Sequence, residues 1–448
     1  MRKVAILMCV TLLGAAPPPS VDAKLRAIIA PVSQAQLRHT IETLVGFGTR
    51  HTLSSQTDPK RGIGAALNWT KGQFESFGLP TVRPCETMTG ERLPGPTRIC
   101  DMVAIQRGTE RPNDVVIITG HIDSRVSDVM NFTSDAPGAN DDGSGTAAVI
   151  EAARVLSKHK FPGTIVYAAV SGEEQGLYGA KVLANYAKAQ GWNVVTDINN
   201  DIIGGTCGSD GVCDSTHARV LSEGPRSQGQ EELARATHAL GGENDAPSRN
   251  ISRFLDSLAD RLKIGLDLRQ IWRTDRFGRG GDHIPFLELG YPAARLNVAI
   301  ENYNWQHQDV RPGYGDTIDH VDFPYLAKMT KLNVAALAAI ASAPPPPEPN
   351  VEGAVSTDTT LTWAPVQGAA SYKAWWRRTD ANQWQTSRAL PASACPSECK
   401  LVLPHIRVDD WVFGVSSVSK DGFESPVASA VPGGAFKPYI APPKEEKK

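Results

Sequence analysis

The chain has no excess of positive charge, because 48 aspartates and glutamates offset its 46 lysines and arginines. A formal net charge of -2 leaves no broad basic surface for a phosphate backbone, so we expect no nucleic-acid partner. Beyond the N-terminal residues, no stretch reaches the roughly 18 apolar residues that a membrane span requires. We therefore expect no membrane span.

Cysteine is scarce, and none of the seven is spaced in the CxxC pattern of a structural zinc site. Cys9 lies in an N-terminal segment with two basic residues, an apolar run over residues 4–13 and small residues after it. This order is typical of a secretory signal cleaved after Ala16 or Ala23, and a buried N-terminal strand is the alternative. We assign residues 1–23 to the signal and expect a secreted or periplasmic protein.

Export makes disulfides possible, and removal of Cys9 leaves six cysteines, which allow fifteen connectivities. Proximity in the sequence favours three short pairs, and reduced structural cysteines are the alternative. The favoured pairs are Cys85 with Cys100, Cys207 with Cys213, and Cys395 with Cys399.

A proline run divides the chain, whose 448 residues suggest about three folding units. Consecutive prolines exclude helix and favour an extended spacer, so we place a linker at residues 344–350. The expected first domain spans residues 24–343. Residues 351–436 form a second domain, and residues 437–448 form a disordered tail.

The second domain has aromatic and apolar residues at period two, which predicts short strands. Trp363, Tyr372 and Trp411 each lie in such a strand, with Gly, Pro and Asp turns between them. About ninety residues of this pattern predict a small all-β sandwich. The stretch Thr359–Pro426 resembles a fibronectin type III domain.

In the first domain, apolar runs of strand length alternate with helical patterns, which predicts an α/β fold. Val115–Thr119 and Ile165–Val170 are almost continuously apolar, as in strands buried on both faces. Residues 144–158 carry apolar side chains at helical spacing, so we expect an amphipathic helix there.

Acidic and histidine clusters follow four predicted strands. They are Gly120–Asp123 after Val115–Thr119, Ser171–Glu174 after Ile165–Val170, Asn199–Asp201 after Asn193–Ile198, and Asn302–His307 after Ala294–Ile300. Ligands of open α/β sheets bind at the carboxyl ends of strands, so these side chains are expected to share one crevice.

Each cluster also has an ordinary structural interpretation. His121 and Asp123 face one side of an extended chain, so Asp123 can orient a metal-binding imidazole, but alone the pair is more often a turn. Asp141, before the predicted helix, is a candidate ligand or part of a turn and N-cap. Asp201 is a candidate ligand or a turn cap.

The adjacent carboxylates of Glu173 and Glu174 repel each other unless solvent or a cation separates their roles. One can coordinate a cation while the other takes a proton from water. Taken together, the histidines and carboxylates are ligands that zinc prefers. Two Zn²⁺ would be neutralised by Asp141, Glu174, Asp201 and one hydroxide, which indicates a two-metal hydrolase.

These residues resemble the secreted two-zinc aminopeptidases, whose relatives include bacterial leucyl aminopeptidase and glutamate carboxypeptidase. The matching segments, in family order, are LVGFGTRHT, ITGHIDS, APGANDDGSGTAAVIEAARVL, AVSGEEQGLYGA, INNDIIG and GDHIPFLELGYPA. The resemblance implies a three-layer, phosphorylase/hydrolase-like sheet with helices on both faces, two zinc ions per chain, and a peptide substrate with a free N-terminus.

The resemblance also implies roles. His121 and Asp201 would hold one zinc, Glu174 and a distal histidine the other, and Asp141 both, with Glu173 as general base and Asp123 orienting His121. His307 is favoured as the distal histidine because it precedes the Asp316-Thr317 pair, whereas His320 follows it. Asp282-His283 receives no ligand role, since glycine precedes it where the family has serine.

Three other functions stay open. They are a carboxypeptidase, a single-zinc acyl transferase resembling glutaminyl cyclase, and a catalytically dead adhesion protein that binds through the fibronectin-like domain. The full two-metal set argues against the acyl transferase, and the presence of Glu173 argues against the dead protein.

Overall fold

The computed structural model describes residues 19–223, 231–239 and 242–432. The predicted tail lies outside these residues, and so does the predicted signal apart from its last five residues. Ser20 caps the first helix, α1 (Val21–Ile29), by accepting a hydrogen bond from the Ala23 N–H. Signal cleavage after Ala16 would keep this helix start, whereas cleavage after Ala23 would remove it.

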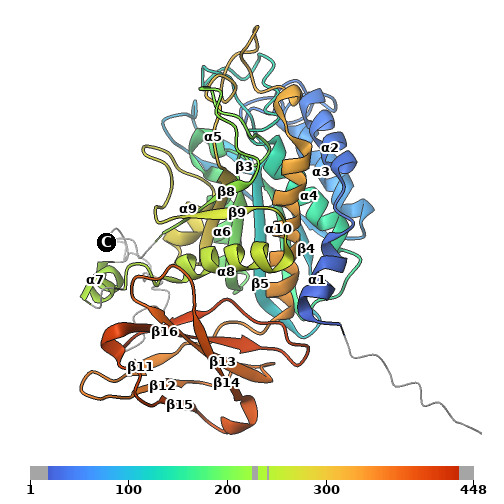
Figure 1. Cartoon of the computed structure of the whole chain (residues 1–448). Helices are drawn as coiled ribbons and strands as arrows, with labels where there is room; N and C mark the ends of the chain where they lie inside the picture. Colours follow the sequence, from blue (N-terminus) through green and yellow to red (C-terminus); the bar gives the residue numbers. More distant parts are fainter. Residues whose placement is uncertain (1–18, 224–230, 240–241, 433–448) are drawn as a thin grey trace, which may run out of the picture.

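A central sheet runs through the first domain (Figure 1). Its eight strands have the order β1-β4-β6-β5-β7-β10-β8-β9. Its strands are β1 (Thr81–Val82), β4 (Met102–Gln106), β5 (Arg111–His121), β6 (Gly163–Val170), β7 (Asn193–Asn200), β8 (His217–Ser222), β9 (Asp267–Ile271) and β10 (Ala293–Val298). The neighbours β6, β5, β7 and β10 run parallel, so their carboxyl ends meet at one edge.

Helices cover both faces of this sheet. One face carries α1, α2 (Gln34–Gly46), α3 (Ile63–Ser76), α4 (Gly143–Leu156), α8 (Pro247–Leu262) and α10 (Phe323–Ser342), and the other carries α6 (Tyr178–Ala189) and α9 (His283–Glu288). In β5, Val116 and Ile118 pack against the first layer, and Val115 and Ile117 against the second. The expected three-layer α/β fold is confirmed.

The remaining elements of this domain are short. They are the hairpin of β2 (Cys85–Met88) and β3 (Thr97–Cys100), the helices α5 (Glu173–Gly176) and α7 (Glu231–Ala239), and the 3-10 turn Ile318–His320. Among the helices of the described residues, none combines the length and apolar character needed to cross a bilayer.

The helix predicted over residues 144–158 is present as α4, but its amphipathic character is wrong. Every residue of α4 except Arg154 is buried. The reason is that α2 and α10 pack over the side that would otherwise face solvent. The spacing of its apolar residues predicted the helix. The burial of its polar face depends on tertiary packing, which that spacing does not contain.

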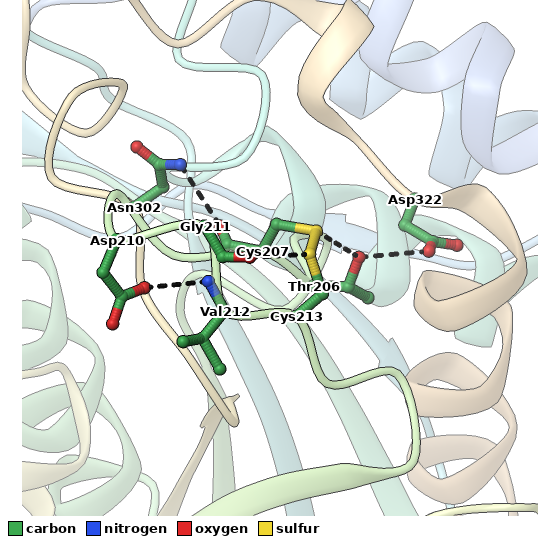
Figure 2. Close-up of a disulfide and its surroundings, with 8 residues drawn as sticks. All are labelled: Thr206, Cys207, Asp210, Gly211, Val212, Cys213, Asn302 and Asp322. Atoms are coloured by element: carbon green, nitrogen blue, oxygen red, sulfur yellow. Dashed lines mark hydrogen bonds between the residues drawn. A yellow bond between two sulfur atoms is a disulfide. The ribbon is translucent and has the colours of Figure 1, made fainter.

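All three favoured disulfides are present: Cys85–Cys100, Cys207–Cys213 and Cys395–Cys399. Figure 2 shows the second, which closes a loop after β7. Asn302 Nδ2 donates to the Cys207 carbonyl at 3.2 Å, and Thr206 Oγ1 donates to Asp322 Oδ2 at 3.2 Å. The loop is thereby tied to two segments that follow β10.

The predicted all-β sandwich is also present. One sheet has the order β11 (Asn350–Glu352), β12 (Thr359–Trp363), β15 (Cys399–Leu403), and the other β14 (Thr386–Pro391), β13 (Ser371–Arg378), β16 (Trp411–Val418), β17 (Ala428–Ala430). Leu361, Trp363, Tyr372 and Phe413 point inward and form its core. The likeness to fibronectin type III domains stays a prediction.

The proline linker is not a free spacer, because its rings pack between the two domains. Pro344, Pro347 and Pro349 are buried. Residues 345–349 line a cavity together with Val194 in β7 and Pro292 just before β10. The sandwich thus lies near the amino ends of these strands, well away from α5 in Figure 1.

A buried ion pair joins the domains, since Arg377 of β13 contacts the carboxylate of Asp245. Arg377→Met would leave Asp245 buried without this partner and should lower the free energy of unfolding by about 3 kcal/mol. Lys373 lies in the same strand as Arg377 and forms a partly exposed ion pair with Glu424. Lys373→Met should lower the free energy of unfolding by less than about 1 kcal/mol. Guanidinium unfolding of the full chain measures both, and equal losses would contradict a structural role for the interface.

Candidate metal centre

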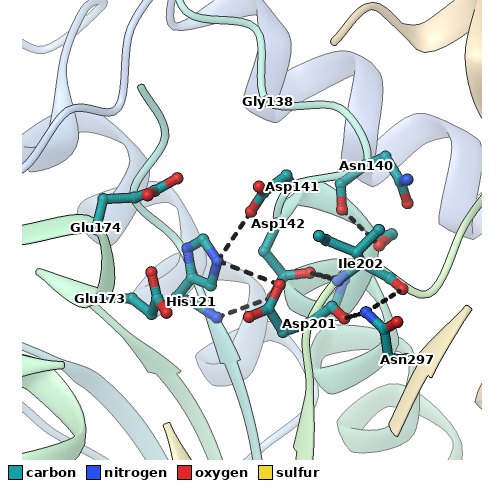
Figure 3. A network of polar contacts seen from close by, with 12 residues as sticks. His121, Gly138, Asn140, Asp141, Asp142, Glu173, Glu174, Asp201, Ile202 and Asn297 are labelled. Atoms are coloured by element: carbon teal, nitrogen blue, oxygen red, sulfur yellow. Dashed lines mark hydrogen bonds and ion pairs between the residues drawn. The ribbon is translucent and has the colours of Figure 1, made fainter. Parts of the chain in front are cut away.

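The predicted site residues lie at the carboxyl ends of neighbouring strands and in the segments that follow them. Figure 3 shows His121, Asp141, Glu173, Glu174 and Asp201. His121 ends β5, Glu173 and Glu174 begin α5 shortly after β6, Asp201 follows β7, Asp141 precedes α4, and His307 lies on the loop after β10. The parallel neighbours β6, β5, β7 and β10 therefore bring together residues that are far apart in the sequence.

Five side chains form two groups that share Asp141. In the first group, His121 Nε2 lies 3.1 Å from Asp141 Oδ1 and 3.7 Å from Asp201 Oδ1. In the second, His307 Nε2 lies 2.8 Å from Asp141 Oδ2 and 3.0 Å from Glu174 Oε1. Each group offers three ligand atoms close enough to hold one cation.

The chemistry of these groups fits zinc. Glu174 Oε1 and Asp201 Oδ1 are buried and accept no hydrogen bond from the residues that the structure describes, which is costly unless a cation meets them. Burial lowers the pKa of His121, but the carboxylates of Asp123, Asp141 and Asp201 raise it well above its usual value. The centre therefore stabilises positive charge, and imidazole with carboxylate is a ligand set of zinc hydrolases.

Asp123 lies behind His121, although its contacts differ in part from the expectation. The nearest acceptor for His121 Nδ1 is the Asp123 carbonyl oxygen at 3.1 Å, and the carboxylate lies 3.6 Å away. That carboxylate accepts hydrogen bonds from Thr52 Oγ1 at 2.9 Å and from the N–H groups of Glu173 and Glu174 at 3.3 and 3.2 Å. Asp123 thus joins the His121 strand to the start of α5.

The N-cap interpretation of the segment before α4 is confirmed for Asp142, and the ligand role of its neighbour Asp141 stays a prediction. Asp142 caps the helix, because its Oδ1 accepts from the Gly145 N–H at 2.8 Å. Its carboxylate also accepts from the N–H groups of His121 at 3.0 Å and Ile202 at 3.2 Å. Asp142 therefore ties three strand and helix ends together, while Asp141 faces the two histidines.

Polar residues that sequence reasoning did not select hold the acids in place. Arg295 Nη2 lies 2.7 Å from Asp201 Oδ2. Gln306 Nε2 donates to Asp141 Oδ2 at 3.1 Å, and the Asp141 N–H donates to Asp316 Oδ2 at 2.6 Å. One feature of the sequence could have identified Arg295, because it is a charged residue inside the apolar run of β10. No local spacing marks Gln306.

The positions of the two candidate distal histidines favour His307. The ring of His320 stacks on Trp305, with centroids 3.7 Å apart, and lies outside both groups. His307 is close to Asp141 and Glu174 as described above. Asp282-His283 also lies outside them, and His283 Nε2 is 2.7 Å from the Thr274 carbonyl oxygen.

Glu173 lies next to the groups without contacting Asp141. Together with His121 and Glu174 it offers a third set of three ligand atoms. Burial and, to a smaller extent, the nearby Glu174 carboxylate raise the pKa of Glu173 to about 8, although His121 acts to lower it. Glu173 therefore takes up a proton more readily than an exposed glutamate, as a general base requires.

The sequence from residue 101 to residue 337 matches the model of Peptidase family M28. The chain belongs to peptidase family M28. Relatives of this M28 peptidase include a probable zinc metalloprotease of Leptosphaeria maculans, 40% identical over 93% of this chain and 98% of the relative. Another, a probable zinc metalloprotease from Pyricularia oryzae, is 39% identical over 92% of this chain and 85% of the relative. The protein is a zinc metallopeptidase.

The M28 fold is also that of a solved enzyme. The Legionella pneumophila LapA aminopeptidase superimposes with a TM-score of 0.54 and 21% identity, over 76% of this chain and 80% of LapA. The part that matches the family model contains both three-ligand groups and Glu173. The site at the strand ends therefore belongs to the peptidase domain.

Proposed function

We propose that this M28 peptidase is a secreted exopeptidase that holds two zinc ions and removes N-terminal residues from peptides. The observation that carries the proposal is the pair of three-ligand groups that share Asp141. His121, Asp141 and Asp201 would hold one ion, and Asp141, Glu174 and His307 would hold the other.

Zinc, when bound, supplies a Lewis acid that polarises the peptide carbonyl and makes water more acidic. Glu173 takes the proton from the attacking water and delivers it to the departing amine nitrogen. Asp123 anchors the start of α5 and so fixes Glu173 relative to His121. Asp142 holds the main chain of His121 against the start of α4.

Cleavage at the N-terminus follows from the family resemblance and is supported by LapA, an aminopeptidase with the same fold. A single-zinc acyl transferase would need only one of the two groups. Aminoacyl anilides with a free amine should be hydrolysed, whereas N-blocked peptides with a free carboxyl terminus should not. Hydrolysis confined to the blocked peptides would favour a carboxypeptidase.

The three disulfides support export to an oxidising compartment. Deleting the sandwich is a poor test of the adhesion alternative, because removing residues 344–448 would take away Arg377, the partner of Asp245, and uncover the face of the peptidase domain that packs against the linker. Functional tests therefore use the full chain rather than the isolated peptidase domain.

Chelation should abolish peptidase activity, and restoration should require two equivalents of zinc per chain. The reason is that Asp141 serves both ligand groups, so that the site is complete only with both ions. The measurement is turnover of an aminoacyl anilide against added zinc, with circular dichroism to show that the chelated protein stays folded. Full activity at one equivalent, or after chelation, would contradict the two-zinc proposal.

A further inference from the structure

The two ligand groups differ in what lies behind their histidines. His121 Nδ1 faces the carbonyl oxygen of Asp123 at 3.1 Å. An acceptor is the usual partner there, because the ring nitrogen that does not bind the metal carries a hydrogen. His307 Nδ1 instead faces Arg125 Nη2 at 2.7 Å. A guanidinium group can only donate, so the two histidines have partners of opposite kinds.

Arg125 also contacts Glu174, which, like His307, is a ligand of the His307 group and not of the His121 group. Its Nε lies 2.8 Å from Glu174 Oε2, while Oε1 of the same carboxylate faces His307. The side chain of Arg125 is 15% exposed and that of Glu174 is 4% exposed, so solvent screens the pair weakly. Within the part of the chain that the structure describes, no hydrogen bond or ion pair of Arg125 reaches His121 or Asp201.

These contacts oppose a cation at the His307 group in three ways. The guanidinium charge repels it, and the bond to Glu174 draws negative charge away from the ligand oxygen. In addition, the Arg125 N–H would face the hydrogen that His307 Nδ1 carries when Nε2 binds a metal. One effect acts in the opposite direction, because Arg125 holds Glu174 in position, and loss of such support typically weakens metal binding by roughly 10- to 100-fold.

The effects that oppose zinc binding outweigh the support that Arg125 gives to Glu174. Without Arg125, Glu174 would be a buried carboxylate with no cationic partner, and a zinc ion at the His307 group would then supply the missing positive charge. On the basis of the two-zinc centre proposed above, we propose that Arg125 makes the His307 group the weaker of the two zinc positions. Filling that position requires Arg125 to give up its contact with His307. Limited zinc therefore occupies the His121 group first.

The His121 group has an arginine as well, but its setting is different. Arg295 is fully buried and shares its charge between Asp201 and Asp275, each 2.7 Å away. Its Nη1 also donates to the Gly280 carbonyl oxygen at 2.6 Å. Arg295 therefore stays in place and leaves the acceptor behind His121 undisturbed.

Calorimetric titration of the chelated full-length protein with zinc tests the proposal. The wild-type protein should bind two ions in separate steps, the second at least tenfold weaker than the first. Arg125→Met should strengthen the second step at least tenfold and change the first less than twofold. Arg125→Lys, which keeps a charge but cannot face Glu174 and His307 together, should give a smaller increase of about threefold.

Arg154→Met is the matched control, because Arg154 binds Glu151 through two bonds of 2.7 Å at similar exposures of 20% and 3%, in the last turn of α4. It should leave both steps unchanged. A second step that is weaker or unchanged in Arg125→Met would overturn the proposal, and if that variant does not fold, an unchanged second step in Arg125→Lys would do so. A wild-type chain that binds fewer than two ions would instead contradict the two-zinc centre.

Discussion

Glu173→Gln should lower kcat about 10³-fold while both zinc ions stay bound. Glutamine has nearly the size of glutamate but cannot accept the proton of the attacking water, and general acid–base catalysis typically contributes about 10² to 10⁴ in rate. Glu173 is not part of the two groups that share Asp141, so its replacement removes no ligand from either. Loss of turnover should therefore be separable from loss of metal.

Zinc content and turnover measured on the same samples check this separation. Glu174→Ala is the comparison variant, because it removes a ligand of the His307 group and should lose one zinc ion together with activity. Near-normal turnover in Glu173→Gln would show that another group is the base. A loss of zinc from that variant would show that Glu173 is a ligand.

Arg50→Met should lower the free energy of unfolding by about 4 kcal/mol. Arg50 is fully buried, and burial lowers its pKa to about 10, so it stays charged at neutral pH. Its guanidinium donates to four carbonyl oxygens, those of Leu44 at 3.1 Å, Ile122 at 2.7 Å, Pro137 at 2.7 Å and Gly138 at 2.9 Å. Methionine would leave these buried acceptors without their donor, at about 1 kcal/mol or more each.

Urea unfolding in the presence of a chelator measures this loss without a contribution from zinc binding. Arg26→Met is the control, because Arg26 donates to a single carbonyl oxygen, that of Arg261 at 2.7 Å, in an exposed contact. It should change the free energy of unfolding by less than about 0.5 kcal/mol. A loss below about 1 kcal/mol in Arg50→Met would contradict the assigned role of Arg50.

The fold and much of the candidate site could be predicted because each depends on short patterns. Val115–Thr119 and Ile165–Val170 are apolar because both faces of their strands are buried, and His121, Glu173 and Glu174 follow them directly. No local sequence pattern predicts that these two strands are neighbours in the sheet. The family resemblance, rather than spacing, assigned which residues share a cation.

Contacts between distant segments could not be predicted. Arg125 is separated by 49 residues from Glu174 and by 182 from His307, so no spacing connects them. The buried polar face of α4 depends on which helices cover it, and the packed linker depends on where the sandwich lies. In each case the physical cause is tertiary contact, which a periodic pattern does not contain.

Anomalous diffraction at the zinc edge, from crystals of the full-length protein grown with zinc, locates the metal ions directly. We expect two peaks, one among His121, Asp141 and Asp201 and the other among Asp141, Glu174 and His307. A single peak at saturating zinc, or peaks that do not lie on either side of Asp141, would contradict the shared two-zinc centre.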